Sequence, residues 1–419
     1  MLQNRFEKFF LCATMTLRKG EFMEKMKIGL FIDTFYPMVD GVIQVVDQYA
    51  TRLCKFADVT VFTTAPRKGK KDTLTHPYKV VRCKVMPVPG RDYDLALPWK
   101  DKAFRKAVEN ADLDIVHIHS PFSIGKAGVK YAKKHNIPVI ATLHSQYKQD
   151  FKKSVKFNWL ASLMVKIIMK TFNQCDRCFA VNGRIAEIYH QDYKAKVLPD
   201  VLLNGTDFTP VEDEKKAIEM VNNHFGLDKD IPVFLFVGRI TELKNIHFIA
   251  KSLKVLKDQG KKFKMIYVGS GPDEGKLASL VKELGLENEV IQAGRIMDRE
   301  LLKAIYFRAK LFLFPSKYDA NSLVQIEAAS QKTPTVFLEN TATSSSVTKD
   351  VNGFIVKDDI NAFAQRIKEV LEDDELYARV QKAAFEQLYF SWDDRVQVAY
   401  KIYQEYIDKK KAENKNKKK

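Results

Sequence analysis

The sequence contains few cysteines and no long apolar run. Its five cysteines are scattered and odd in number, which argues against the disulfide framework of a small secreted domain and favours a reducing compartment. Cys175 and Cys178 form one C-x-x-C pair without a second pair. We interpret them as small apolar residues, because a zinc or redox site needs partners that the sequence does not offer. No run of about 18 apolar residues occurs, so no segment is expected to span a bilayer.

The familiar nucleotide and nucleic-acid motifs are also missing. The glycine-rich stretch 269–277 lacks the spacing of a Walker loop, and its third glycine comes one place too late for a dinucleotide-binding G-x-G-x-x-G. No helix-turn-helix, zinc-finger or RNA-recognition pattern is present. The net charge is +17, of which the lysine-rich tail 409–419 carries six charges. This excess indicates an anionic lipid surface or a phosphate-bearing substrate more than a nucleic acid.

Short apolar segments alternate with amphipathic stretches from Lys27 onward. Nearly continuous runs of this kind, rich in Val and Ile, predict parallel strands that are buried on both faces. The alternation occurs twice, so we predict an α/β chain with two doubly wound, Rossmann-like domains that face each other. The predicted strands are 27–32, 58–63, 79–83, 114–119, 138–144 and 177–182 in the first half, and 233–238, 264–270, 290–294, 311–316, 333–338 and 353–356 in the second.

A turn cluster and charged stretches mark the predicted domain boundaries. The cluster at 203–207 separates an N-terminal domain, 26–205, from a C-terminal domain, 206–390. Residues 391–408 predict a helix that crosses back onto the first domain, and 409–419 form the tail. Residues 1–25 are interpreted as a disordered leader or an early start, since no small-residue cleavage site follows their apolar patch.

Two cations follow the first strand of the second half. In the motif that runs from Gly238 through Arg239 to Lys244, a glycine that permits close backbone approach precedes a helix start. Backbone N–H groups at a helix start, together with two cations, suit a diphosphate. Taken alone, a solvated basic helix start is the commoner explanation of such a motif.

Two carboxylates, separated by seven residues, follow the predicted strand 311–316. Asp319 falls in the loop, and Glu327 falls about one turn into the next helix, among apolar neighbours. Carboxylates accept paired hydroxyls well, which suits a ribose and a hexose. The alternative is a helix cap followed by a surface glutamate, although an acid in apolar surroundings needs a partner.

Three histidines lie at or near the ends of two predicted strands. His117 and His119 alternate along one strand and so share a face. Two histidines can ligate zinc, but no third ligand is visible, and we predict no metal site. We interpret His119 as part of the active-site wall and His117 as structural. His144 ends its own strand, where a lone histidine is often only packed.

Taken in order, these motifs resemble retaining glycosyltransferases of family 4, which have the GT-B fold. The resemblance runs from Lys27 to Asp408 and rests on G-R-x4-K, on the two carboxylates about eighty residues later, and on further matches around Gly41, His119, His144, Asn204-Gly205 and Asn352-Gly353. The sequence departs from the family pattern at Asp319, where Glu is usual, and at Ser322, where Gly is usual.

The resemblance implies a role for each matching residue and no metal or other cofactor, with a nucleotide diphosphate sugar as co-substrate. Arg239 and Lys244 would bind the diphosphate and act in catalysis with His144, while His119 and His144 would lie on the acceptor side. Glu327 would hold the ribose and Asp319 the sugar hydroxyls. The implied donor site comprises Gly41, Gly238, Arg239, Lys244, Arg295, Ile296, Asp319, Asn321, Ser322, Leu323, Val324 and Glu327.

Basic surfaces suggest the acceptor. A membrane-facing group is predicted at Trp99, Lys100, Lys102, Arg105 and Lys106. A second candidate is a lysine stripe along a helix at 151–172, formed by Lys152, Lys156, Lys166 and Lys170. A solvated lysine face explains the first group equally well, and for the second a core helix with a lysine stripe is favoured over an interfacial helix. Similar patches occur in bacterial diacylglycerol glucosyltransferases and phosphatidylinositol mannosyltransferases. We therefore expect transfer of a hexose, from UDP-glucose or a similar donor, to a lipid at the cytoplasmic face of the membrane. The alternatives are a soluble or polysaccharide acceptor in envelope assembly, and a catalytically weak scaffold subunit.

Overall fold

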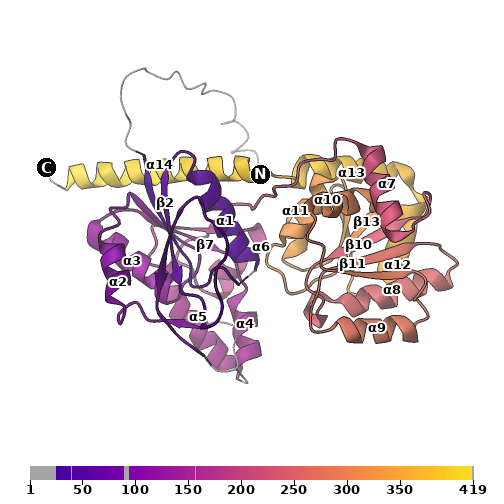
Figure 1. Cartoon of the computed structure of the whole chain (residues 1–419), viewed down its shortest axis with the longest axis horizontal. Helices are drawn as coiled ribbons and strands as arrows, with labels where there is room; N and C mark the ends of the chain where they lie inside the picture. Colours follow the sequence, from indigo (N-terminus) through magenta and orange to yellow (C-terminus); the bar gives the residue numbers. More distant parts are fainter. Residues whose placement is uncertain (1–24, 39, 89–93, 156, 418–419) are drawn as a thin grey trace, which may run out of the picture.

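The computed structural model describes residues 25–38, 40–88, 94–155 and 157–417, and it contains two halves built on separate sheets (Figure 1). The first sheet has the strand order β3-β2-β1-β6-β7-β8-β9, and the second has the order β12-β11-β10-β13-β14-β15. All neighbouring strands in these two sheets are parallel. The predicted α/β class with two doubly wound sheets is therefore confirmed. The predicted leader lies outside the described residues, apart from Lys25.

The strands of both sheets are short, and the inner ones are almost wholly buried, as their Val-, Ile- and Phe-rich sequences predict. The edge strands Lys79–Cys83, Asp200–Val201 and Val290–Gly294 are more exposed. The first sheet comprises β1 (Lys27–Phe31), β2 (Asp58–Thr64), β3 (Lys79–Cys83), β6 (Ile115–Ile118), β7 (Val139–Leu143), β8 (Arg177–Ala180) and β9 (Asp200–Val201). The second comprises β10 (Val233–Val237), β11 (Lys264–Val268), β12 (Val290–Gly294), β13 (Leu311–Phe314), β14 (Thr335–Leu338) and β15 (Phe354–Val356). The sequence pattern missed β9 and the small antiparallel pair β4 (Val85–Met86) and β5 (Leu95–Ala96), because two residues show no periodicity.

Helices cover both faces of each sheet, and many begin at an Asp, Asn or Ser whose side chain accepts a backbone N–H. In the first half they are α1 (Gly41–Leu53), α2 (Lys102–Glu109), α3 (Ser123–His135), α4 (Tyr147–Ser154), α5 (Asn158–Phe172) and α6 (Gly183–Glu187), which continues as a π-helix to Asp192. In the second half they are α7 (Glu214–Phe225), α8 (Ile246–Asp258), α9 (Glu274–Glu283), α10 (Arg299–Arg308), α11 (Leu323–Ser330), α12 (Ile360–Glu372) and α13 (Asp374–Leu388), with 3-10 turns at Glu242–Lys244 and Thr343–Ser346.

The helix expected at 151–172 is not continuous, which corrects the sequence analysis. Val155 and Phe157 have extended backbone, so α4 ends at Ser154 and α5 begins at Asn158. The break interrupts the helical register, and Lys152 therefore does not belong to the lysine stripe on α5. Lys156 lies outside the described residues.

The last helix, α14 (Trp392–Asn416), lies along the first half although it follows the second half in sequence (Figure 1). Trp392, Val396, Ala399, Tyr403 and Ile407 form its buried stripe, and Tyr403 hydrogen-bonds His117 of β6 at 2.7 Å. The predicted crossing helix is confirmed. The helix continues beyond Asp408 to Asn416, and so includes most of the lysine-rich tail.

The two chain segments that connect the halves run side by side. Thr206 N–H donates to Phe390 O at 2.8 Å, and Trp392 N–H donates to Thr206 O at 3.1 Å. A Cβ on Gly205 would lie 2.7 Å from backbone atoms of Ser391 and Trp392. Asn204-Gly205 is thus more than a turn signal, because this close crossing requires a residue without a side chain.

Candidate active site

Each sheet has one point at which the strand order reverses. In the first sheet this point lies between β1 and β6, and in the second it lies between β10 and β13. Ligands of open parallel sheets bind beyond the carboxyl ends of the strands at such switch points. The residues that follow these strands, with those after the neighbouring β7, form the candidate site. We call the residues that follow β6 and β7 the histidine edge, and the residues that follow β10 and β13 the charged edge.

The histidine edge is built on His119, which follows β6, and His144, which follows β7. His119 Nδ1 and His144 Nε2 are 3.0 Å apart, and the two rings are stacked. Both side chains are buried, although His144 keeps 9% of its surface exposed. Burial lowers the pKa of His144 to about 3 and holds the pKa of His119 well below its ordinary value. Both imidazoles are therefore neutral near pH 7.

His117 and Asp33 support this edge from behind. His117 uses both ring nitrogens, one to the Tyr403 hydroxyl and one to Thr142 Oγ1, each at 2.7 Å. Asp33 accepts hydrogen bonds from Ser120 Oγ at 2.6 Å and from Ile124 N–H at 2.8 Å, at the start of α3. These side chains are hydrogen-bonded within the protein, whereas His144 bonds through Nε2 and its Nδ1 makes no hydrogen bond within the described residues.

Lys244 and Asp319 form an ion pair at the charged edge. Both side chains are largely buried, with 17% and 15% of their surfaces exposed, and Asp319 Oδ2 is buried without a hydrogen-bond partner among the described residues. The sequence predicts Lys244 as a ligand of the diphosphate and Asp319 as a ligand of the sugar hydroxyls. The structure brings them together, so that one oxygen of Asp319 holds Lys244 and the other points to no protein partner.

Tight glycine contacts bring the loops after β10 and β11 together beside this pair. Gly238 has φ +155° and Gly269 has φ +134°, and a Cβ on Gly269 would overlap the Gly238 carbonyl. Arg239 follows Gly238, is exposed, and makes no hydrogen bond or ion pair within the described part of the chain. Arg295 is also exposed, and Ile296 is half-buried after β12. The backbone and two arginines are thus open to an approaching ligand.

Helix α11 starts at this edge. Ser322 is its N-cap residue but makes no side-chain capping bond, so the N–H groups of the first turn, which begins at Leu323 and Val324, lack that cap. Glu327 lies one turn further on, where its Oε2 accepts a 2.8 Å bond from the Tyr306 hydroxyl and its Oε1 lies 3.9 Å from Arg299. Burial raises the pKa of Glu327. The predicted helical position of Glu327 is confirmed.

Several hydrogen bonds join the two halves, and sequence analysis missed all of them. Gln146 Nε2 donates to the carbonyls of Tyr318, at 3.1 Å, and Asp319, at 3.3 Å. Asn182 Nδ2 donates to Ala320 O at 2.6 Å, and Asn321 Nδ2 donates to Val181 O at 2.9 Å. The side chain of Asn321, expected near the donor, is therefore used between the halves. The available signal was a polar residue just after a buried strand, since Gln146 and Asn182 follow β7 and β8.

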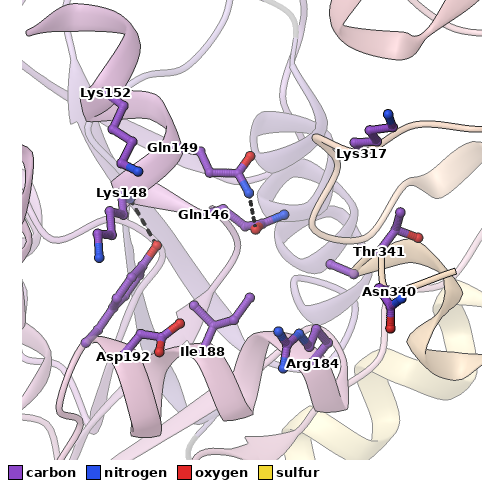
Figure 2. Close-up of a pocket in the computed structure, with 12 residues that line it drawn as sticks. Gln146, Lys148, Gln149, Lys152, Arg184, Ile188, Asp192, Lys317, Asn340 and Thr341 are labelled. Atoms are coloured by element: carbon purple, nitrogen blue, oxygen red, sulfur yellow. Dashed lines mark hydrogen bonds between the residues drawn. The ribbon is translucent and has the colours of Figure 1, made fainter. Parts of the chain in front are cut away.

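A hollow of about 270 Å³ opens beside Gln146 (Figure 2). Its lining comes from both halves and is mostly polar: Gln146, Lys148, Gln149, Lys152, Arg184, Ile188, Asp192, Tyr193, Lys317, Asn340, Thr341 and Ala342. None of these is a predicted donor residue. Gly41, predicted to line the cleft, begins α1, and a Cβ there would meet no atom within 4 Å.

A second hollow lies along α5, and we call it the lysine groove. Its volume is about 690 Å³. Its lining contains several lysines and one acidic residue, Asp192, and Val165, Met169 and Tyr193 supply apolar surface. Its lysines are Lys148, Lys166, Lys170, Lys194 and Lys196. On the same helix Trp159, Leu163 and Ile167 are exposed by 66%, 44% and 44%. Their spacing of four places them on one face, the α5 ridge.

The predicted membrane-facing group around α2 is also exposed. Trp99, Lys100, Lys102, Arg105 and Lys106 all lie at the surface, whereas Phe104 and Val108 are buried beneath them. Trp99 and Lys100 precede α2, which Asp101 caps through a 3.1 Å bond from Phe104 N–H.

Within the described residues, no three His, Cys, Asp or Glu side chains gather as metal ligands would. In the same part of the chain, no helix has both the length and the apolar character needed to cross a bilayer.

Comparison with protein families identifies the chain. The model of Glycosyltransferase Family 4 matches residues 39–209, and the model of Glycosyl transferases group 1 matches residues 219–387. The chain is a family 4 glycosyltransferase of the GT-B fold. The two matched segments follow the two sheets, so the histidine edge of this glycosyltransferase belongs to the family 4 segment and its charged edge to the group 1 segment.

Similar proteins agree with this assignment. The glycosyltransferase is 27% identical over 325 residues to alpha-monoglucosyldiacylglycerol synthase of Streptococcus pneumoniae, covering 74% of this chain and 70% of that protein. It is 25% identical over 324 residues to alpha-monoglucosyldiacylglycerol synthase of Acholeplasma laidlawii, covering 74% and 80%. Among solved structures, Anabaena HepE in complex with UDP has the same fold, with a TM-score of 0.73 and 18% identity over 91% of this chain and 100% of that one.

Proposed function

We propose that this glycosyltransferase moves a hexose from a nucleoside diphosphate sugar, UDP-glucose or a close relative, to a membrane lipid such as diacylglycerol, with retention of configuration. The observation that carries the proposal is the pairing of two unlike edges. Neutral histidines end the strands of one sheet, cations and carboxylates end those of the other, and Gln146 joins the two through the Asp319 carbonyl. The names of the two similar synthases and of the UDP complex support the lipid acceptor and the donor base.

The donor is held mainly by the charged edge in this proposal. Arg239 and Lys244 bind the diphosphate, assisted by the N–H groups at the start of α11, where the helix dipole favours an anion. The Gly238–Gly269 contact lets the backbone approach the phosphates. Glu327 accepts the ribose hydroxyls, Arg295 and Ile296 flank the base, and the free oxygen of Asp319 accepts a sugar hydroxyl. Gly41 leaves room on the opposite side of the cleft.

The chemical step needs no protein nucleophile. The acceptor oxygen forms a bond to the anomeric carbon on the face from which the diphosphate leaves, as the bond from that carbon to the phosphate oxygen breaks. The acceptor proton passes to the departing phosphate. Arg239 and Lys244 stabilise the negative charge that develops there, and His144 orients the sugar and acceptor hydroxyls.

The surface of the first half supports a membrane acceptor. The α5 ridge offers apolar side chains to the interfacial region, and the lysine groove beside it carries cations that anionic lipids attract. The α2 group adds a further basic face with Trp99. We propose that the protein is peripheral at the cytoplasmic face of the membrane and that α5 makes the apolar contact. The polar hollow beside Gln146 favours a second candidate, a hydroxyl-rich soluble acceptor, for the same chemistry.

The donor and acceptor are tested with nucleotide sugars and vesicles of phosphatidylcholine and phosphatidylglycerol that contain diacylglycerol. We expect an α-linked glycolipid from an α-linked donor, identified by proton NMR of the first product. A β-linked product would mean inversion and a true general base, and it would overturn the mechanism. Transfer to soluble sugars without lipid product would favour the second candidate, and absence of both would favour the scaffold alternative.

The membrane contact is tested by vesicle sedimentation of two matched triple variants. We expect the change of Trp159, Leu163 and Ile167 to Ser to abolish most binding to anionic vesicles, since each loses apolar insertion. The change of Lys102, Arg105 and Lys106 to Gln should weaken binding by about 1 kcal/mol per charge and reduce its salt dependence. Equal pelleting of the α5 variant and the unchanged protein would contradict the role given to α5.

A further inference from the structure

The hydrogen bond between His119 and His144 determines which ring nitrogens carry protons, as well as the position of the two rings. Each ring is neutral near pH 7, and a neutral imidazole carries its proton on one nitrogen and a lone pair on the other. His119 Nδ1 and His144 Nε2, 3.0 Å apart, must therefore share one proton. If His119 donates, the free nitrogen of His144 carries a proton. If His144 donates, its free nitrogen carries a lone pair and can act as a base.

The surroundings of His119 decide between these two arrangements. Its other nitrogen, Nε2, is buried without a hydrogen-bond partner in the described structure. The ring is packed against His117, whose own nitrogens are occupied, and against the edge of Tyr49. If His119 accepted from His144, its proton would stand on Nε2 as a buried, unpaired N–H. Such orphan donors are rarer in proteins than unpaired acceptors. The proton of His119 therefore belongs on Nδ1.

The remaining nitrogen of His144 faces the opposite environment. His144 Nδ1 is not among the buried, unpaired atoms of the described residues, so it lies in the part of the ring that stays exposed. This part follows β7 on the side where Gln146 contacts the charged edge. With Nε2 accepting from His119, Nδ1 carries the proton.

We propose that His119 is a positioning residue that fixes the tautomer of His144, so that His144 offers an N–H donor, and no basic lone pair, to a hydroxyl oxygen in the cleft. The substrate side of this inference rests on the proposed function. The tautomer itself does not. A donor at this place orients a sugar or acceptor hydroxyl and leaves its proton free for the departing phosphate, as the retaining step requires. The low pKa of His144, caused by burial, keeps the ring neutral.

The tautomer is measured directly by ¹⁵N NMR of the full chain labelled at histidine. Long-range ring correlations distinguish a protonated Nδ1 from a protonated Nε2. His144→Gln and His119→Asn identify which signals belong to each residue. We expect both rings to be neutral and protonated on Nδ1. A protonated Nε2 on His144 would overturn the proposal, whether or not the protein transfers sugar in the assay used.

Kinetics then test whether His119 acts through His144. His119→Phe keeps a ring but removes the donor, and kcat should fall on the order of 10²-fold with less change in the donor KM, since a misplaced catalytic group costs about that much. His119→Asn keeps an N–H near the place of Nδ1 and should restore most of the rate. In a His144→Ala background, His119→Phe should have no further effect. An equal, additive loss in that background would overturn the positioning role.

Thr142→Val serves as the matched control, because it breaks the neighbouring hydrogen bond to His117 and leaves the His119–His144 pair intact. We expect a rate close to that of the unchanged protein and an unchanged His144 tautomer. A loss as large as that of His119→Phe would show that general loosening of the sheet, and not the proton position, explains the effect. Loss of turnover with every donor, alongside the expected tautomer, would count against the proposed function alone.

Discussion

The histidine edge and the charged edge hold their polar groups in place by opposite means. At the histidine edge, the buried neutral rings of His119 and His144 follow strands β6 and β7 and hydrogen-bond each other, and His117 within β6 bonds Thr142 and Tyr403 of α14. At the charged edge, ionised side chains stand on the loops after β10 and β13 and neutralise each other. The histidines of the first edge are neutral near pH 7, whereas the second edge holds charge that an incoming anion can engage.

This difference matches the two tasks of a glycosyl transfer. A neutral donor on a rigid strand end positions hydroxyls without removing their protons. In the proposed mechanism, the cation that Asp319 holds in place without a ligand would meet the diphosphate as charge develops on it. Each edge is therefore suited to a different part of the reaction, and the predictions below separate them.

The largest effect is expected from breaking the ion pair at the charged edge. Lys244→Met removes the cation and leaves the largely buried Asp319 carboxylate uncompensated, which should lower the free energy of unfolding by about 3–5 kcal/mol. Affinity for UDP should fall by about 1.5–3 kcal/mol for each charge-assisted bond lost. Urea unfolding and calorimetry with UDP measure the two effects.

The double variant Lys244→Met with Asp319→Asn separates stability from donor binding. Removing both charges should recover most of the unfolding free energy, while UDP stays weakly bound. Unchanged UDP affinity in Lys244→Met would show that the lysine serves only the fold. No comparable rescue is expected at the histidine edge, because its groups are uncharged.

A pH titration of stability should report the histidine edge. The folded pKa values of His117 and His144 are lowered to about 3 by burial, whereas an unfolded histidine titrates near 6.5. Their contribution is complete above about pH 6.5 and is lost as the pH falls toward 3. Each histidine should cost about 1.4 kcal/mol for each pH unit in that window. Urea unfolding at pH 7.5, 6.5 and 5.5 measures the slope.

His144→Gln provides the comparison for this titration. It removes one buried imidazole, so the number of protons taken up on unfolding between pH 6.5 and 5.5 should fall by most of one proton. If the unfolding free energy of the variant has the same pH dependence, His144 titrates normally in the folded protein. The conclusion that His144 is held neutral by burial would then be wrong.

The sequence predicts the sheets well because local chemistry determines them. The apolar runs at Lys27–Ile32 and Val233–Gly238 have the length and composition expected of parallel strands buried on both faces, and both are strands. The residues that follow such runs fall at the carboxyl ends of the strands, which is why the sequence places His119, His144 and Gly238 there. Short elements such as β9 carry no periodic signal and were missed.

What the sequence does not predict is pairing across distance. Lys244 and Asp319 are 75 residues apart, and Gln146 meets Tyr318 across 172 residues, so neither pattern nor spacing indicates these contacts. The interruption between α4 and α5 was missed for a related reason, because helical spacing on both sides of Val155 resembles one continuous helix. Tertiary packing decided each of these cases.

The smallest effect is expected at Glu327, where the charged edge is most like the histidine edge. Its carboxylate is buried, its pKa is raised by that burial, and Tyr306 fixes one oxygen at 2.8 Å. Glu327→Gln should therefore cost little stability, while the loss of a charged acceptor should weaken UDP by about 1 kcal/mol. Calorimetry with UDP and with 2′-deoxy-UDP locates the cause. In the unchanged protein the missing hydroxyl should weaken binding, and in Glu327→Gln this difference should shrink.

Glu300→Gln, at an exposed glutamate of α10, is the matched control and should leave both affinities unchanged. If UDP and 2′-deoxy-UDP differ equally in Glu327→Gln and in the control, Glu327 does not hold the ribose. The carboxylate would then serve the packing of α11 against Tyr306. A smaller difference between UDP and 2′-deoxy-UDP in Glu327→Gln would instead show that Glu327 contacts the ribose. A carboxylate that is buried and hydrogen-bonded, as the histidines are, would then still belong to the donor site.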